Sequence, residues 1–197
     1  QTDDELEDLD IQIDNLTLTE MNIAINLGVL YNTKVEIDGI QVIDCDEGII
    51  LADHHYPGTQ NSHILVHHSL FSNIDGYGII NFQEEDGSAN SDIGIYLHNN
   101  TFSNIGKYAV YNRWQPGITK GDCHIELINN IFSHAYLAEN DGSGQQSYNL
   151  FYHSTPTGSN QIIANPLFID AINNNLYLRS TSPAIDTSRH YCVCNIS

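Results

Sequence analysis

Apolar and polar side chains alternate at period two in several short stretches of the chain. The series Ile93, Ile95, Leu97 and the pair Ile125, Leu127 follow this pattern, with polar or small residues between them. Period two places alternate side chains on one face of a β-strand. No stretch has the i, i+3, i+4, i+7 apolar spacing over three turns that an amphipathic helix needs. The pattern therefore predicts an all-β protein built from short strands.

The alternating stretches belong to a sequence repeat. The segment ILVHHSLFSNIDGYGIIN (64–81) aligns with IYLHNNTFSNIGKYAVYN (95–112) at a shift of 31 residues, and IELINNIFSHAYLAEN (125–140) follows after a further 30. All copies share one apolar slot, which is filled by Leu18, Val42, Phe71, Phe102, Phe132 and Phe151. A repeat that keeps its apolar slots while its length varies is typical of a solenoid, in which each turn stacks on the one before.

The variation in repeat length is concentrated in three segments rich in Gly, Pro, Ser, Asn or Asp: 53–62, 82–92 and 113–122. Such composition indicates loops. Because the three segments recur at equivalent points of the repeat, we expect them to leave the solenoid at the same corner.

Two copies of the repeat carry a family signature. NNTFSNI (99–105) and NNIFSHA (129–135), each preceded by alternating Ile and Leu, resemble turns of the right-handed parallel β-helix, or pectate-lyase-like, superfamily. Residues 164–188 are similar to the last turn of many secreted bacterial members. The resemblance implies a single right-handed parallel β-helix of about six or seven turns. It would span 11–188, between an acidic segment (1–10) and a strand-like tail that contains cysteine (189–197).

The repeat also predicts which side chains face the interior. The shared apolar slot should form a core column with neighbours about 4.8 Å apart. Asn99 and Asn129 occupy one slot, which His68 fills in the preceding turn. We expect this slot to point inward, where an asparagine can satisfy the backbone of its own turn and pass an amide hydrogen bond to the next.

If the alternating apolar residues point inward, the residues between them form three columns on the outer face of one sheet. The columns read Lys34, His63, Gly94, His124; then Glu36, Leu65, Tyr96, Glu126; and then Asp38, His67, His98, Ile128. Asp38, His67 and His98 are the candidate catalytic residues, because side chains about 4.8 Å apart can share a proton, position a base or bind a metal. An ordinary polar solvent face is the alternative. The resemblance implies that an active site would lie on this sheet, under loops such as 53–62.

Two further groups are candidates for binding. Tyr96 and the pair Arg113-Trp114 combine aromatic rings with a rare cation, which suits contact with a sugar. Glu84, Glu85 and Asp86 offer the oxygen ligands that Ca²⁺ prefers, although they lack the spacing of a known Ca²⁺ loop. Ca²⁺ is therefore the one cofactor to consider, and none is assigned.

Charge narrows the choice of partners. The chain has 25 Asp and Glu against 6 Lys and Arg, a formal net charge of −19. This charge repels nucleic acid and anionic lipid, and an anionic uronan would need bridging Ca²⁺. The sequence contains no run of eighteen apolar residues that would predict a membrane span and no basic start followed by a short apolar run. We expect a mature protein that is secreted or displayed at the cell surface.

Cys45, Cys123, Cys192 and Cys194 are disulfide candidates in such a location. Cys45 and Cys123 lie in different parts of the repeat, so they should not reach one another. The tail would have to carry Cys192 or Cys194 back to the body or into a neighbouring chain. A zinc site formed by the two tail cysteines and His190 is the alternative.

The motifs of sugar-cleaving relatives are missing. The Gly-His-Gly and Arg-Ile-Lys strings of polygalacturonase-like members do not occur, and Lys34 is the one basic residue of the kind used by pectate lyases on the predicted outer face. The leading interpretation is a non-enzymatic structural or adhesive module. Because no amphipathic helix covers either end, we expect it to assemble end to end into fibres, against the repulsion of its acidic start. The alternatives are a uronan lyase or epimerase, and a passive glycan-binding module that uses Tyr96 and Trp114.

Overall fold

The computed structural model describes residues 9–28, 32–53, 62–83, 93–114, 123–137 and 144–185. Within this part of the chain the regular structure is strands, apart from one short 3₁₀ turn at Ala171–Asn173. No helix among these residues is long and apolar enough to cross a membrane. The acidic start and the cysteine-containing tail predicted at 1–10 and 189–197 lie largely or wholly outside the described residues.

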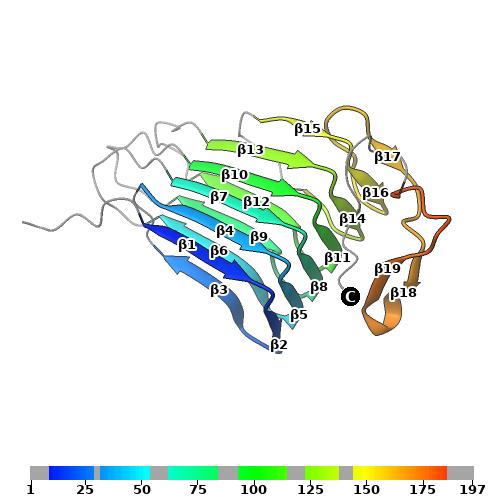
Figure 1. The fold of residues 1–197 in the computed structure, drawn as a ribbon, viewed down its shortest axis with the longest axis horizontal. Helices are drawn as coiled ribbons and strands as arrows, with labels where there is room; N and C mark the ends of the chain where they lie inside the picture. Colours follow the sequence, from blue (N-terminus) through cyan, green and yellow to red (C-terminus); the bar gives the residue numbers. More distant parts are fainter. Residues whose placement is uncertain are drawn as a thin grey trace, which may run out of the picture.

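Three sheets with parallel strand pairs make up most of the molecule (Figure 1). Sheet A consists of β1 (Asp10–Asp14), β4 (Lys34–Asp38), β7 (Ser62–His67), β10 (Ile93–His98), β13 (Cys123–Ile128) and β15 (Gln146–Ser147). Sheet B consists of β2 (Thr17–Thr19), β5 (Gln41–Cys45), β8 (Leu70–Ile74), β11 (Thr101–Ile105), β14 (Ile131–Ser133), β16 (Leu150–Tyr152) and β17 (Ile162–Ile163). Sheet C consists of β3 (Ile23–Gly28), β6 (Glu47–Asp53), β9 (Ile79–Gln83) and β12 (Val110–Trp114).

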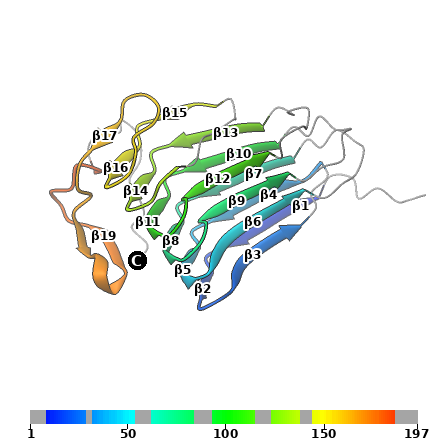
Figure 2. The same ribbon diagram turned by 180° about the vertical axis from the view of Figure 1, so that it is seen from behind.

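The chain visits the sheets in the order A, B, C and then returns to A, so neighbouring strands in each sheet are one repeat apart. Sheet A faces the viewer in Figure 1, and sheet C faces the viewer from behind in Figure 2. Ile64 of sheet A, Phe71 of sheet B and Ile79 of sheet C belong to the same buried cluster. The three sheets therefore share one apolar core, and the all-β prediction is confirmed.

The predicted register of the apolar slot is confirmed. Its members pair in sequence along sheet B, from Leu18 through Val42 to Phe71, Phe102, Phe132 and Phe151. The four phenylalanine rings stack face to face, with centroids 4.8, 5.3 and 5.3 Å apart. All four rings are fully buried. Burial of this aromatic column is a main source of stability for the stack.

The loops predicted at 53–62, 82–92 and 113–122 lie mostly outside the described residues, but the strands that flank them are described. Asp53 pairs with Gln83, and Gln83 pairs with Trp114, where the chain leaves sheet C. The strands that follow begin at Ser62, Ile93 and Cys123, which are also paired in sheet A. The chain therefore leaves sheet C and enters sheet A at equivalent positions, as the repeat predicts.

The turn from sheet A to sheet B is built around a left-handed residue. His68, Asn99 and Asn129 have φ values of 50, 58 and 58°, a conformation that asparagine tolerates better than most residues. These three residues share one slot, as predicted, but the expectation that they point into the core is wrong. They are half-buried, and it is the next residue in each turn, at Ser69, Asn100 and Asn130, that is buried. The positive φ bends the chain and interrupts the period-two alternation of the strand, so the following side chain enters the interior.

The buried asparagines form a ladder along the stack. The amide of Asn100 donates to the Val66 carbonyl at 2.8 Å, and its oxygen accepts the Ser69 N–H at 3.0 Å. Asn130 repeats both contacts one turn later, at 2.7 Å to Leu97 and 2.9 Å from the Asn100 N–H. Asn149 repeats them again. Each amide therefore satisfies a carbonyl and an N–H of the preceding turn, at a corner where strand pairing is interrupted.

Residues 164–185 leave the parallel stack, whereas the sequence predicts that they form its last turn. The strands β18 (Phe168–Asp170) and β19 (Asn175–Leu178) pair antiparallel with each other. The turn between them lies against the outer face of sheet B, where Asn174 accepts hydrogen bonds from the Ser72 hydroxyl at 2.8 Å and the Asn73 amide at 3.2 Å. Ala184 of this segment forms a second buried cluster with Ile131 and Leu150 of sheet B. Outward-facing apolar residues of sheet B explain why the chain folds back here.

Candidate functional site

The outer face of sheet A carries the residues that the sequence predicts for it. The inward residues Val35, Ile37, Ile64 and Val66 are fully or almost fully buried. The strand registers place the remaining side chains in the three predicted columns, with Asp38 beside His67 and His67 beside His98. The arrangement of this face is therefore confirmed, while the chemistry assigned to it remains a prediction.

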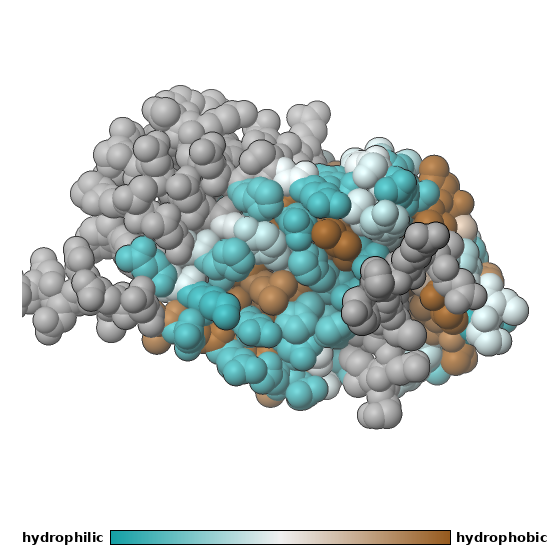
Figure 3. Space-filling view, turned by 45° about the horizontal axis from the view of Figure 1, so that its top comes forward, coloured by the Kyte–Doolittle hydropathy of each residue, from teal (hydrophilic) through white to brown (hydrophobic). Residues whose placement is uncertain are grey.

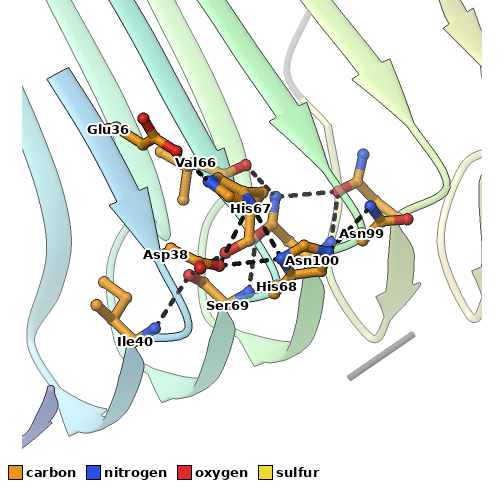
Figure 4. A network of polar contacts seen from close by, with 10 residues as sticks. Glu36, Asp38, Ile40, Val66, His67, His68, Ser69, Asn99 and Asn100 are labelled. Atoms are coloured by element: carbon orange, nitrogen blue, oxygen red, sulfur yellow. Dashed lines mark hydrogen bonds and ion pairs between the residues drawn. The ribbon is translucent and has the colours of Figure 1, made fainter. Parts of the chain in front are cut away.

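Asp38, His67 and His68 converge at the end of β4 and β7 (Figure 4). The Oδ1 atom of Asp38 lies 3.3 Å from Nδ1 of His67 and 3.0 Å from Nδ1 of His68. The two Nδ1 atoms are themselves 3.0 Å apart. Among the described residues, these three form the one group of histidine, cysteine or carboxylate side chains close enough together to hold a metal ion.

The third member of this group differs from the residue that the sequence predicts. His98 pairs with His67 in the register, but its Nε2 atom instead contacts Glu126 at 2.7 Å. His68 takes its place because the left-handed turn, with φ of 50°, brings its ring beside that of His67. Sequence reasoning assigned His68 to the corner slot alone. The adjacent histidines at the end of a strand were the available signal.

A second carboxylate from β4 holds the other side of the His67 ring. Nε2 of His67 lies 3.2 Å from Oε1 of Glu36. His67 therefore bridges two carboxylates, with Glu36 at Nε2 and Asp38 at Nδ1. The side chain of His67 is 17% exposed, compared with 41% for Asp38 and 44% for His68. The cluster is anchored on its inner side and open to solvent on its outer side.

A row of rings occupies the other end of the same face. Tyr96 stacks on His63, with centroids 4.1 Å apart, and lies 5.4 Å from His124 on its other side. The row is continuous because the Tyr96 ring fills the space above Gly94, where a Cβ atom would lie 2.7 Å from its Cε2. Both faces of the Tyr96 ring are therefore covered, which leaves its edge and hydroxyl for a ligand. Burial, followed by the charge of Lys34 and then by His124, lowers the pKa of His63.

The other predicted binding residues are placed apart from Tyr96. Arg113 and Trp114 lie in β12 of sheet C rather than in sheet A, and their side chains are outside the described part of the structure. Glu84, Glu85 and Asp86, the predicted metal-binding residues, also lie outside it. The structure therefore does not bring the predicted sugar-binding residues together on one sheet.

The disulfide candidates are described in part. Cys45 is buried and free, with its Sγ atom 3.4 Å from the Ile43 carbonyl oxygen. Cys123 begins β13, but its side chain lies outside the described residues, as do Cys192 and Cys194. Cys45 acts as a core residue of sheet B.

A groove that the sequence does not predict lies between sheet B and the folded-back segment. Its volume is about 630 Å³. One wall comes from sheet B and includes Ser103, Ser133 and Tyr152, and the other comes from the segment that contains Phe168 and Arg179. None of the described residues that line the groove is acidic, although the chain as a whole has a net charge of −19.

The floor of the groove includes a second column of left-handed residues, at the turn from sheet B to sheet C. Asn73, Asn104 and His134 have φ values of 54, 55 and 52°. The Asn104 amide donates to Asn73 at 2.8 Å, and the Asn73 amide donates to Asp44 at 2.9 Å. Burial, and then the neighbouring His153, lowers the pKa of His134. The Asn73 and Asn104 amides and the His134 imidazole thus follow one another along the groove at the spacing of the stack.

The surface in Figure 3 is mainly hydrophilic where its residues are described, with small apolar patches between. Small apolar patches are ordinary on protein surfaces and do not by themselves indicate a docking face for another protein. No family model, curated protein or solved structure matches the chain. Its function therefore has to be argued from its own geometry.

Proposed function

We propose that the chain is a single right-handed parallel β-helix of about six or seven turns that serves outside the cell as a structural and adhesive module. The order A, B, C of the strands, the shared core and the ladders along the stack support this fold. Six strands in sheet A and seven in sheet B support the number of turns. The extracellular location rests on the similarity of residues 164–188 to the last turn of secreted bacterial β-helix proteins.

The observation that carries the adhesive role is the groove beside sheet B. Its volume of about 630 Å³ is suitable for a few sugar units. Asn73, Asn104 and Asn165 supply amides, Arg179 supplies a guanidinium, and Tyr152 supplies an aromatic wall. Amides both donate hydrogen bonds to sugar hydroxyls and accept them, guanidinium groups donate to them, and aromatic rings pack on the apolar faces of sugars. We infer that the ligand is a neutral oligosaccharide, because the total charge of −19 disfavours a polyanion.

The test is calorimetric titration with neutral oligosaccharides, and with oligouronates as a separate arm. Asn104→Gly removes a groove amide while keeping a residue that accepts positive φ. Its matched control is Asn160→Gly, because Asn160 is also exposed and left-handed, with φ of 52°, but does not line the groove. We expect Asn104→Gly to weaken binding about tenfold, equivalent to a lost hydrogen bond in a desolvated site, and Asn160→Gly to leave it unchanged.

Three outcomes would overturn the glycan proposal. These are the absence of binding to any saccharide in either arm, binding to uronates alone, and equal binding by the two asparagine variants.

A fibre-forming role is a second candidate, and the free strand edges favour it. Within the described residues, β1, β2 and β3 are the first strands of their sheets and each pairs on one side only. A strand with an unpaired edge offers a row of backbone donors and acceptors to another chain. An identical copy could continue all three sheets from this end.

A uronan lyase or epimerase that acts on sheet A is the enzymatic alternative. Its support is the 3.3 Å contact between Asp38 and His67, the kind of pair that positions an imidazole as a base. It predicts that the chain shortens or epimerises polyuronate in the presence of Ca²⁺. If reducing ends and uronate composition both stay unchanged, this alternative is wrong.

A further inference from the structure

We propose that Asp38, His67 and His68 bind one Zn²⁺ ion on the outer face of sheet A. The inference is independent of glycan binding in the groove, because the two sites lie on different sheets and share no residue. It rests on the distances between the three candidate ligand atoms, on the hydrogen bonds those atoms cannot all make, and on the carboxylate that holds the His67 ring.

The three ligand atoms already have the spacing that a tetrahedral ion needs. Zn²⁺ binds nitrogen and oxygen ligands at about 2.0–2.1 Å, so two ligands of a tetrahedral site lie about 3.3–3.4 Å from each other. The corresponding distances are 3.3 Å from Asp38 to His67, 3.0 Å from Asp38 to His68 and 3.0 Å between the two histidines. Side-chain shifts of a few tenths of an ångström would complete three vertices of the tetrahedron.

Hydrogen bonds alone cannot satisfy this triangle. An ionised Asp38 only accepts, so both histidines must donate from Nδ1 to satisfy it, and the two N–H groups then face each other at 3.0 Å. If one histidine donates to the other instead, the acceptor nitrogen points its lone pair at the Asp38 oxygen. One of the three short contacts is therefore unfavourable in each arrangement. A cation at the centre makes all three favourable.

Glu36 selects the tautomer of His67 that a metal requires. Glu36 lies 3.2 Å from Nε2 of His67, where it accepts the proton of that nitrogen and leaves the Nδ1 lone pair for the ion. A carboxylate in this position is the usual partner of a metal-binding histidine. The His67 ring is thus held from the side opposite the proposed ion. The amide nitrogen of Asn99 lies 3.5 Å from Nε2 of His68, so binding of the ion at Nδ1 of His68 requires this amide to turn its oxygen toward Nε2.

The ligand set also selects the type of metal. Two imidazole nitrogens and one carboxylate favour Zn²⁺ and its neighbours in the transition series, whereas Ca²⁺ and Mg²⁺ prefer oxygen ligands. Because Asp38 and His68 are 41% and 44% exposed, the fourth vertex is open to water or to a ligand. The proposed site therefore has three protein ligands and an open position, the arrangement of sites at which zinc contacts small molecules.

The experiment is a calorimetric titration of the metal-free protein with ZnCl₂ alone. The starting protein carries Cys192→Ser and Cys194→Ser, which removes the competing zinc site that the sequence suggests in the tail. His68→Asn is the test variant, because asparagine already occupies the same left-handed slot at Asn99 and Asn129. His98→Gln is the matched control, since His98 lies on the same face but contacts Glu126.

We expect one zinc ion per chain, with binding weakened at least about tenfold by His68→Asn and unchanged by His98→Gln. Glu36→Gln should weaken binding about tenfold while keeping the stoichiometry, because it removes only the partner of His67. Addition of millimolar CaCl₂ should not displace the zinc. Stoichiometric binding that His68→Asn leaves unchanged would overturn the proposal, as would the absence of stoichiometric binding.

A second measurement keeps the test independent of mutant folding. The protein used here keeps all of its histidines. Its ¹⁵N spectra should show that zinc changes the chemical shifts of Nδ1 of His67 and His68, with Nε2 still protonated. Coordination through Nε2, or shifts confined to other histidines, would contradict the assigned ligand atoms.

Discussion

Asn100 stabilises the corner between sheets A and B through hydrogen bonds to the backbone, although its amide buries no apolar surface. Its fully buried amide bonds to the Val66 carbonyl and the Ser69 N–H in the preceding turn and to Asn130 in the next turn. The ladder is thus a polar counterpart of the phenylalanine column. Since each amide depends on its neighbours for position, its removal leaves groups unpaired in a dry environment.

Asn100→Ala should therefore destabilise the protein by about 2–4 kcal/mol, because a buried N–H and a buried carbonyl lose their partner at about 1–3 kcal/mol each. The free energy of unfolding from urea titration measures this loss. Asn104→Gly, which removes an exposed amide of the outer column, is the control and should cost less than about 1 kcal/mol. Equal losses in the two variants would mean that the buried ladder has no special role.

Two histidines make stability depend on pH. Burial is the main cause that lowers the pKa of both His63 and His134 from 6.5. The unfolded chain therefore takes up protons first as the pH falls, so the contribution of these residues to stability is complete above about 6.5 and decreases below it. Because both side chains are exposed, solvent screening keeps the decrease small.

The proton signals of these two rings should consequently titrate below the range of a free histidine in NMR spectra. Lys34→Gln should raise the pKa of His63 only in part, since the charge of Lys34 is the second cause after burial. The pKa of His134 should not change in this variant. A full return of His63 to 6.5 would show that charge, rather than burial, is the main cause.

At the scale of the strand, the stack depends on close contact between the backbones of successive turns. Gly78 is buried immediately before β9, where a Cβ atom would lie 2.6 Å from the Ala109 carbonyl oxygen and 3.1 Å from Cδ1 of Phe102. The carbonyl belongs to the hydrogen-bonded backbone and cannot move away alone. Gly94 differs, because the nearest obstacle there is the side chain of Tyr96.

Gly78→Ala should cost about 1–3 kcal/mol, because the turns must separate to admit the methyl group. Gly94→Ala, the matched substitution, should cost less than about 1 kcal/mol, because the half-buried Tyr96 ring can rotate outward. Thermal and urea unfolding of the two variants compare these costs directly. If Gly94→Ala is the more destabilising, the row of rings on sheet A matters more to the fold than the spacing of the backbones.

At the scale of the whole molecule, the two ends of the stack differ. The strands β1, β2 and β3 form one end. At the other end, within the described residues, β12 is the last strand of sheet C and is followed by a single bridge from Val110 to Leu137, while sheets A and B continue to β15 and β17. A contact between unlike ends is heterologous, so it propagates as a fibre and does not close into a dimer. The stagger reduces the number of strands that can pair at once, and the net charge of −19 opposes contact.

We therefore expect association that is weak at low salt and stronger when salt or Ca²⁺ screens the charge. Sedimentation velocity with and without Ca²⁺, under oxidising and reducing conditions, measures it. A dependence on oxidation would indicate that the tail cysteines, Cys192 and Cys194, fasten the joint. A single monomeric species in all four conditions would remove the fibre hypothesis and leave the glycan-binding module.

The sequence by itself determined the strands, their order and their register, because a stacked repeat converts spacing along the chain directly into contacts in space. The shift that aligns Phe71 with Phe102 also places His67 beside His98. The shorter shift that aligns Val42 with Phe71 places Asp38 beside His67. Period-two alternation then separates inward from outward residues within each strand. These deductions need no knowledge of the turns.

Only the tertiary structure decided what happens where the alternation stops. The sign of φ at Asn99 determines that Asn100, and not Asn99, enters the core, and the same turn at His68 brings that ring to His67. The return of residues 164–185 across sheet B depends on outward apolar residues, Ile131 and Leu150, that belong to other turns. Corner geometry and contacts between distant segments are not encoded in the repeat period, so the zinc-binding cluster and the groove emerge only when the chain is folded.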